Sequence, residues 1–208
     1  MSIKTSRLIL KSTIFTASLI PIGWLAFALW SDTIKATSFM TVDPVQKLNR
    51  ELGDWALIFI IITLTLRPLA EVLKISEFIS YRRMMGLYAF FYAVLHFASY
   101  MVLDLQFDLA ELFQDIIKRN FILVGMLAIM LLVPLALTSS KVMIKRIGGR
   151  RWKKIHYLVY PIAILSSLHF FMMIRADFSR PIIYAGIIII LLAYRLFKHL
   201  DKASPKDV

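Results

Sequence analysis

Cysteine is absent from the 208 residues of the chain. Without a thiol the protein forms no disulfide, binds no iron–sulfur cluster through cysteine and offers no thiolate nucleophile. It also lacks the Cys-x-x-Cys-His attachment of c-type haem. Any haem in this protein is therefore held without covalent bonds to the chain.

Acidic residues are scarce, because 13 Asp and Glu stand against 25 Lys and Arg, and the formal net charge is +12. Such a charge can indicate nucleic-acid binding, but these basic residues fall between apolar runs and do not interleave with aromatic residues along one face. The sequence also lacks a Gly-x-Gly-x-x-Gly motif and a Ser/His/Asp arrangement. We interpret the charge as a sign of membrane topology and predict no nucleic-acid partner.

Apolar residues are abundant, at 59% of the chain with a mean hydropathy of +0.72. Crossing a bilayer takes about 20 apolar residues in a helix. The apolar runs lie at about Leu8–Trp30, Trp55–Leu69, Met84–Leu103, Phe121–Leu137, Ile155–Ile174 and Pro181–Phe197. The first is too long for a signal peptide and is expected to stay as an anchor. We predict an all-α, polytopic membrane bundle of about six transmembrane helices that forms one domain over residues 1–208.

Alternate connections between these runs carry most of the basic residues. These residues are Lys4, Arg7 and Lys11, then Lys74, Arg82 and Arg83, then Lys141 through Lys154, and finally Lys198, Lys202 and Lys206. The opposite connections, Asp32–Arg50 and Asp104–Arg119, contain charges of both signs. By the positive-inside rule, the basic connections and both termini are predicted to face the cytoplasm.

Histidine is the informative residue, because an ionisable side chain at membrane depth is costly and usually functional. The chain has four: His96, His156, His169 and His199. His96 lies roughly 18 Å along the third run from Met84, and His169 roughly 21 Å along the fifth run from Ile155, at 1.5 Å per residue. Two imidazoles at similar depth on two helices can ligate a haem iron axially. We therefore predict that His96 and His169 bind haem b, and that interfacial His199 does not.

The neighbours of these two histidines fit that prediction. Ala89 and Ala93 lie one to two turns before His96 and leave space for a porphyrin. Ser166, one turn before His169, is a candidate acceptor for the imidazole N–H. Small residues also let transmembrane helices pack closely, and a buried histidine can simply bond to a neighbouring helix. Both interpretations remain open at this point.

Three stretches resemble the MsrQ family, within the ferric-reductase-like transmembrane superfamily of cytochrome-b type. They are TLRPL at 65–69, RRMMGL at 82–87 leading to Leu95-His96, and RWKKIHYLVY at 151–160 leading to Leu168-His169-Phe170. The resemblance spans nearly the whole chain, and the order of three histidines makes it fairly specific. MsrQ is the haem-binding membrane subunit of the bacterial periplasmic methionine-sulfoxide reductase system.

The resemblance implies a haem b electron-transfer subunit in the bacterial inner membrane, without a sulfoxide-reducing catalytic site of its own. Its electrons would come from the quinone pool or a cytoplasmic flavin reductase. They would pass to a periplasmic molybdopterin enzyme that repairs oxidised methionine in proteins. The family is also associated with flavin mononucleotide (FMN), which the sequence does not place.

The superfamily has paired histidines at two depths, and the chain departs from this pattern. The position thirteen residues before His96 is Arg83, so His156 lacks an evident histidine partner. His156 and His169 are also roughly 140° out of phase on an ideal helix, with Pro161 between them. We predict a second cofactor site near His156 and Arg83, where a guanidinium can bind a haem propionate or a flavin phosphate. Arg175 is placed to bind a propionate of the haem between His96 and His169.

Two other functions remain open from the sequence. One is a self-sufficient transmembrane ferric or quinone reductase, which would need no periplasmic partner. The other is a small transporter or structural membrane subunit, whose histidines carry protons or hold helices together. Bound haem would distinguish the cytochrome from the second alternative.

Overall fold

The structure is a computed structural model, and it describes residues 3–35 and 39–203. Of the basic residues used to predict topology, Lys206 lies outside these ranges, and the side chains of Lys4, Arg7 and Lys202 are not among those described. Six helical segments in the described ranges are long and apolar enough to cross a membrane. They are Leu8–Lys35, Pro44–Val72, Glu77–Asp104, Asn120–Leu137, Gly149–Met173 and Ser179–Asp201. The predicted all-α bundle of about six transmembrane helices is confirmed.

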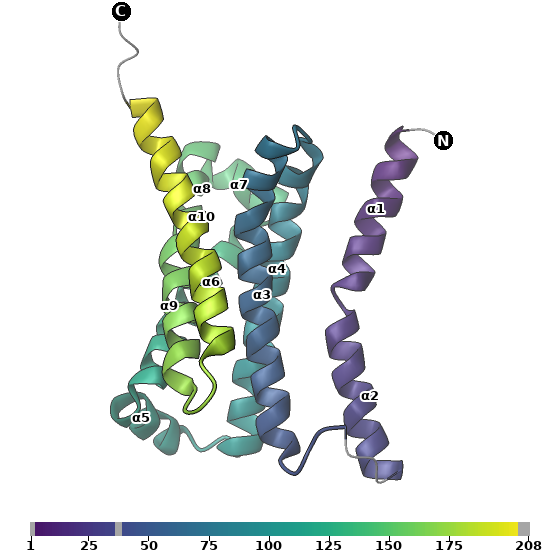
Figure 1. Cartoon of the computed structure of the whole chain (residues 1–208), viewed down its shortest axis with the longest axis vertical. Coiled ribbons are helices and arrows are strands. Elements are labelled where there is room, and N and C mark those ends of the chain that lie inside the picture. The colour runs from purple at the N-terminus through teal and green to yellow at the C-terminus, as the bar shows by residue number, and fades with distance from the viewer. Residues whose placement is uncertain (1–2, 36–38, 204–208) are drawn as a thin grey trace, which may run out of the picture.

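Successive membrane-crossing helices of the bundle run antiparallel to one another (Figure 1). The structure divides them as α1 (Ile3–Ala17), α2 (Ile20–Lys35), α3 (Pro44–Val72), α4 (Glu77–Ser99), a π-helical turn (Tyr100–Asp104), α5 (Leu109–Lys118), α6 (Asn120–Leu137), α7 (Lys141–Ile147), α8 (Gly149–His156), α9 (Val159–Met173) and α10 (Ser179–Ala203). The closest pairs are α3 with α4 and α6 with α9. The start of α1 and the end of α10 lie at the same end, together with α7 and α8. We call this the basic end, and the opposite one the α5 end.

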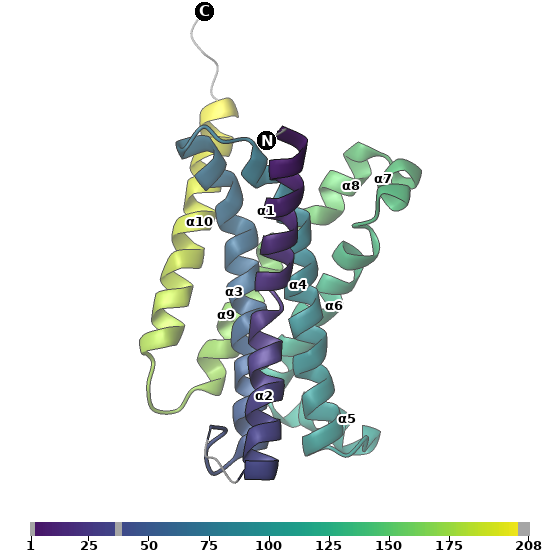
Figure 2. The same cartoon turned by 90° about the vertical axis from the view of Figure 1, so that its right-hand side faces the viewer.

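Two of the predicted apolar runs are broken. The first run divides into α1 and α2 at Ser18 and Leu19, just before Pro21, whose ring has no N–H to donate. The Tyr92 hydroxyl of α4 enters the break: it donates to the Ser18 carbonyl at 2.8 Å and accepts from the Ile22 N–H at 3.3 Å. One hydroxyl thus satisfies two backbone groups, as lipid-embedded helices require. In Figure 2 the α1 and α2 segment lies along α3 and α4.

The fifth run also divides, into α8 and α9 at Tyr157 and Leu158. Pro161 lies in the first turn of α9, where a missing N–H is tolerated. His156 is therefore the last residue of α8, and His169 belongs to α9. The core between the helices contains Phe59 of α3, whose ring lies 5.3 Å from that of Tyr92 and 5.4 Å from that of Tyr88.

Candidate functional site

His96 of α4 and His169 of α9 face each other inside the bundle. Their ring centroids lie 6.1 Å apart, and their planes are inclined at 73°. The two residues are 73 positions apart in the sequence. His96 belongs to the α3–α4 pair of helices and His169 to the α6–α9 pair. The structure thus brings together the two histidines that the sequence placed at similar depth.

A backbone carbonyl on a neighbouring helix fixes each ring. His96 Nδ1 lies 2.9 Å from the Asn49 carbonyl oxygen, and His169 Nδ1 lies 2.7 Å from the Phe121 carbonyl oxygen. A carbonyl oxygen only accepts hydrogen bonds, so each Nδ1 carries the proton and each Nε2 keeps a lone pair for a metal. The acceptor for His169 is therefore a carbonyl on α6. Ser166 only lines the cavity.

A glycine lies beneath each imidazole, four residues after the carbonyl that binds it. A Cβ on Gly125 would lie 2.8 Å from His169 Nδ1, and one on Gly53 would lie 3.2 Å from His96 Nδ1. A side chain at Gly125 would collide with the His169 ring, and one at Gly53 would fit only if the His96 ring shifted by a few tenths of an ångström. Ala89 and Ala93 could be related to His96 because they are near it in the sequence, whereas these two glycines are near the histidines only in space. A glycine inside an apolar helical run is the signal that could have identified Gly125.

The cavity around the two imidazoles is mostly apolar, and its charged lining residues are Arg50, Asp54 and Arg119. Asp54 is paired with Arg180 of α10 at 3.0 Å. Apolar lining residues include Leu57, Ile60, Ala93, Ile129 and Leu132. Ala93 therefore lines this cavity as expected, whereas Ala89 lines a second one described below. Arg50 and Arg119 line both this cavity and an adjoining one at the α5 end. Exposed Arg175 lines only the adjoining cavity.

Arg119 is positioned by the turn that follows His96. In this π-helical turn, the Tyr100 hydroxyl donates to the Asp115 carboxylate of α5. The other oxygen of Asp115 lies 3.0 Å from Arg119 Nε. Asp115 is buried, so its negative charge holds the guanidinium at the mouth of the cavity. Arg119 also lies two residues before Phe121, whose carbonyl fixes His169. Arg119 was not predicted as a site residue, because only the fold brings it to the histidines.

A second cavity, of about 410 Å³, lies at the basic end. His156 lines it, and its ring packs on Trp152 with centroids 4.0 Å apart. The ring partner of His156 is thus a tryptophan and not a second histidine. Its Nδ1 lies 3.1 Å from the Trp152 carbonyl. Arg82 and Arg83 both line this cavity, but Arg82 is half-buried and Arg83 is exposed.

The donor set at His96 and His169 fits the iron of haem b. Two metal–imidazole bonds of about 2 Å, plus the distance from each nitrogen to its ring centre, add up to roughly 6 Å. The rings of His96 and His169 are 6.1 Å apart. Both Nε2 atoms are unprotonated, and most of the surrounding side chains are apolar, as a porphyrin requires. His156 offers one such nitrogen without a facing imidazole, so it does not make an equivalent pair.

Comparisons with known proteins agree with this geometry. The ferric reductase like transmembrane component family matches residues 52–167. The haem-binding subunit MsrQ of protein-methionine-sulfoxide reductase from Xanthomonas oryzae pv. oryzae is 39% identical, over 97% of this chain and 92% of the relative. The subunit of the same name from Polaromonas naphthalenivorans is 44% identical, over 93% of this chain and 86% of the relative. The chain belongs to the MsrQ family.

The same sequence also matches part of a larger protein. Magnetosome protein MamZ of Magnetospirillum gryphiswaldense is 42% identical over 90% of this chain, but the match covers only 29% of MamZ. An MsrQ-like bundle thus occurs within a longer chain. The predicted resemblance to MsrQ and to the ferric-reductase-like superfamily is confirmed.

Proposed function

We propose that the chain is a haem b electron-transfer subunit of a methionine-sulfoxide reductase system, with His96 and His169 as the axial ligands. Two independent observations support the proposal. The relatives described above are named haem-binding subunits, and the two imidazoles face each other at a spacing that suits an iron between them. The proposal treats residues 1–208 as one transmembrane domain, and the 97% coverage by one relative supports this.

The residues of the site would hold and insulate the cofactor. The Asn49 and Phe121 carbonyls keep the protons on Nδ1 and orient the two rings. The apolar cavity wall excludes water, and Arg50 and Arg119 at its mouth can bind carboxylates. Haem b bound between these histidines supplies reversible one-electron chemistry.

We also propose a direction for the electrons. They come from the quinone pool or a cytoplasmic flavin reductase and leave to a periplasmic molybdopterin methionine-sulfoxide reductase, across the bacterial inner membrane. The charge distribution supports the orientation, since the basic end carries α8 and the start of α4.

A reporter inserted between Asp104 and Leu109 is expected to be active only if it functions outside the cytoplasm. If a reporter that functions only in the cytoplasm were active at that site, the proposed topology would be wrong.

The remaining cofactor assignments concern the two ends of the bundle. His156 and Arg83 line the cavity at the basic end, where the predicted donor would deliver electrons. Arg175 lies near the mouth of the haem site and is proposed to bind a propionate. FMN belongs to the proposal only through the family resemblance, and its content per purified chain is the direct test.

Spectroscopy on the purified chain tests the function. The protein is expected to be red, with a Soret band that shifts on reduction by dithionite. A colourless protein after expression with ample haem would favour the transporter or structural alternative. A self-sufficient reductase would turn over with a soluble acceptor alone. The proposed subunit instead needs its periplasmic partner for methionine-sulfoxide reduction.

A further inference from the structure

Helix α5 lies outside the six membrane-crossing segments but is connected directly to two of them. Asp104 ends one crossing segment and Asn120 begins the next, and α5 (Leu109–Lys118) lies between them. Its 10 residues are too few to cross a bilayer. Both views of the bundle show α5 at one end of the crossing helices (Figures 1 and 2). The helix is therefore attached at both of its ends to the level of a bilayer surface.

The chain turns sharply between the crossing segment and α5. Gln106 and Phe107 have φ angles of 46° and 65°, in the left-handed region that residues other than glycine seldom adopt. The Phe107 N–H donates to the Met101 carbonyl at 2.9 Å. The Asp108 carboxylate then accepts from the Ala110 N–H at 2.8 Å and caps the start of α5. The direction of α5 is thus fixed by ordered contacts.

One side of α5 is packed against the π-helical turn that follows His96. Leu112 is buried there with Met101, and Ile116 packs against the same cluster. Asp115 is buried on this side, and its carboxylate accepts a hydrogen bond from the Tyr100 hydroxyl. Apolar packing and a polar contact together hold this side of the helix on the protein.

Another side of α5 is apolar and exposed. Leu109, Phe113 and Ile117 are 60%, 64% and 80% exposed, respectively. They are four residues apart, so they form one stripe along the helix. The polar side chains lie on the remaining side, and they are Glu111, Gln114 and Lys118. A helix with separate apolar and polar faces is typical of the boundary between headgroups and acyl chains.

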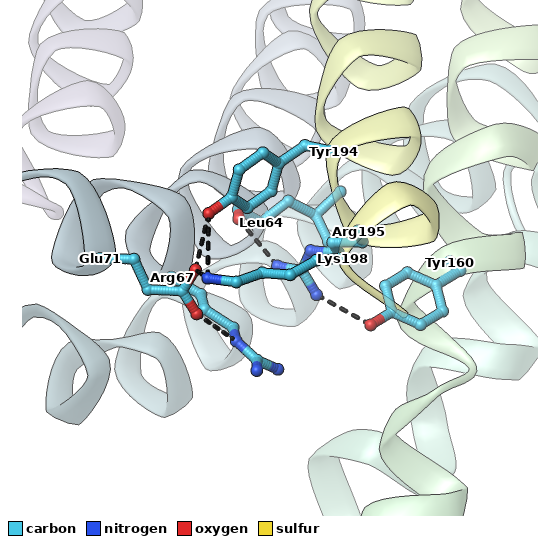
Figure 3. Close-up of polar contacts among 7 residues, drawn as sticks. All are labelled: Leu64, Arg67, Glu71, Tyr160, Tyr194, Arg195 and Lys198. Carbon is cyan, nitrogen blue, oxygen red and sulfur yellow. Dashed lines mark hydrogen bonds and ion pairs between the residues drawn. The ribbon is translucent and has the colours of Figure 1, made fainter. Parts of the chain in front are cut away.

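The crossing helix α10 is a reference for such an arrangement. Glu71 of α3 accepts hydrogen bonds from Tyr194 at 2.6 Å and from Lys198, and these contacts hold one side of α10 on the bundle (Figure 3). Phe197, 73% exposed, belongs to the apolar surface that this crossing helix turns to lipid. Asp115 resembles Glu71, since its charge is also shared by a tyrosine hydroxyl and a cation. The exposed stripe of α5 is thus comparable to a lipid-facing surface.

Residues of α2 indicate a bilayer surface at the same end of the bundle. Trp24 and Trp30 of α2 are exposed, and the Lys35 ammonium lies 5.4 Å from the centre of the Trp30 ring. Tryptophan is enriched where headgroups meet acyl chains, and lysine extends its charge from there toward water. Figure 2 shows the end of α2 and α5 at the same end of the crossing helices. Lipid is therefore available at the level of α5.

We propose that α5 is an interfacial anchor, which lies on the bilayer surface with Leu109, Phe113 and Ile117 among the lipid acyl chains. Its polar side carries charges of both signs, so burial of the apolar stripe and not attraction to anionic headgroups binds it. Asp115, on the side opposite the stripe, lies 3.0 Å from Arg119 at the mouth of the histidine cavity. The anchor thus ties that mouth to the membrane surface. The proposal does not rest on haem binding.

Spin labelling of the full-length purified chain tests the anchor. Because the chain has no cysteine, each introduced cysteine is the only labelled position. The labelled variants are Phe113→Cys and Ile117→Cys in the stripe, Gln114→Cys on the polar side, and Ile190→Cys on the exposed surface of α10. Each is placed in nanodiscs of phosphatidylcholine, which has no net charge. The collision rate of the label with oxygen, which concentrates in lipid, is divided by that with a water-soluble nickel chelate.

The ratio should be several-fold higher at Phe113→Cys and Ile117→Cys than at Gln114→Cys, and it should approach the ratio at Ile190→Cys. Equal ratios at Phe113→Cys and Gln114→Cys would place the stripe in water. Labels in the stripe that are shielded from both reagents would indicate a protein occupant, such as a second copy of the chain. Either result overturns the proposal. The Soret band of each variant tests the haem proposal separately, because the collision ratio is measured with or without bound haem.

Discussion

The two cavities of the bundle share a wall but differ in chemistry. Ile60 and Leu132 line both of them. On one side, two imidazoles are oriented by carbonyls and surrounded by apolar residues. On the other, a single histidine packs on a tryptophan among five cations. The three histidines in membrane-crossing segments therefore do not share one environment. What distinguishes the pair is a facing imidazole, a carbonyl acceptor on a neighbouring helix and a glycine close to each ring.

The largest expected effect is at the paired histidines. His96→Ala or His169→Ala should each remove most of the bound haem, because one imidazole in an apolar cavity holds iron far less firmly than two. The pyridine-haemochrome content per chain measures the loss. His199→Ala is the control, since His199 is exposed near the end of α10, and it should leave the haem content unchanged. If all three variants lost the same amount of haem, the paired histidines would not differ from exposed His199.

The glycines offer a graded test of the same cavity. Gly125→Ala places a methyl group 2.8 Å from His169 Nδ1, whereas Gly53→Ala places one 3.2 Å from His96 Nδ1. Gly125→Ala should weaken haem binding by about 10- to 100-fold, as expected when a metal ligand is misoriented. Gly53→Ala should weaken it less. Gly186→Ala in α10 meets no atom within 4 Å and should have no such effect. Haem titration of the apoprotein gives the ranking, and the reverse order would contradict the packing described here.

The cavity at the basic end should respond differently. His156→Ala is expected to keep a substantial haem spectrum while slowing reduction by the electron donor. Stopped-flow reduction and haem content, measured on the same preparation, separate the two effects. Unchanged reduction kinetics would make His156 an interfacial residue without a redox role. A haem loss equal to that of His96→Ala would make it an axial ligand, and the comparison between the cavities would fail.

Much of the bundle could be predicted from the sequence because lipid imposes a simple rule on helix length and polarity. Counting residues along two helices was also enough to place His96 and His169 at one level. The breaks at Ser18 and Tyr157 were not predicted. At Ser18 the backbone is satisfied by a tertiary contact, the Tyr92 hydroxyl. At Tyr157 it is satisfied by local turn bonds, such as the one from the Tyr157 N–H to the Lys154 carbonyl.

The details of the histidine site depend on contacts between segments distant in sequence. The carbonyl acceptors lie 47 and 48 residues from their histidines, and no local pattern in the sequence identifies them. The same limit applies at the basic end. Arg83 and Arg82 are adjacent in the sequence, and only the rotation of α4 decides which of the two is half-buried.

The smallest expected effect lies outside both cavities. It is a change in the free energy of unfolding that involves helix packing and no cofactor. Tyr92→Phe leaves the Ser18 carbonyl and the Ile22 N–H without their shared partner, and it should lower the free energy of unfolding by about 1–3 kcal/mol. Tyr88→Phe removes a single bond to the Phe15 carbonyl and should cost about 1 kcal/mol. Thermal unfolding in detergent compares the two. Haem content should stay constant in both, and a loss of haem in Tyr92→Phe would connect the α1–α2 break to the site.

Electron paramagnetic resonance of the oxidised, purified protein tests the bis-histidine site most directly. Two axial imidazoles make ferric haem low-spin, and ring planes inclined at 73° predict a strongly anisotropic low-spin signal. That signal should disappear in both His96→Ala and His169→Ala and persist in His156→Ala. A high-spin ferric signal in the unaltered protein would contradict the assignment of His96 and His169 as a ligand pair.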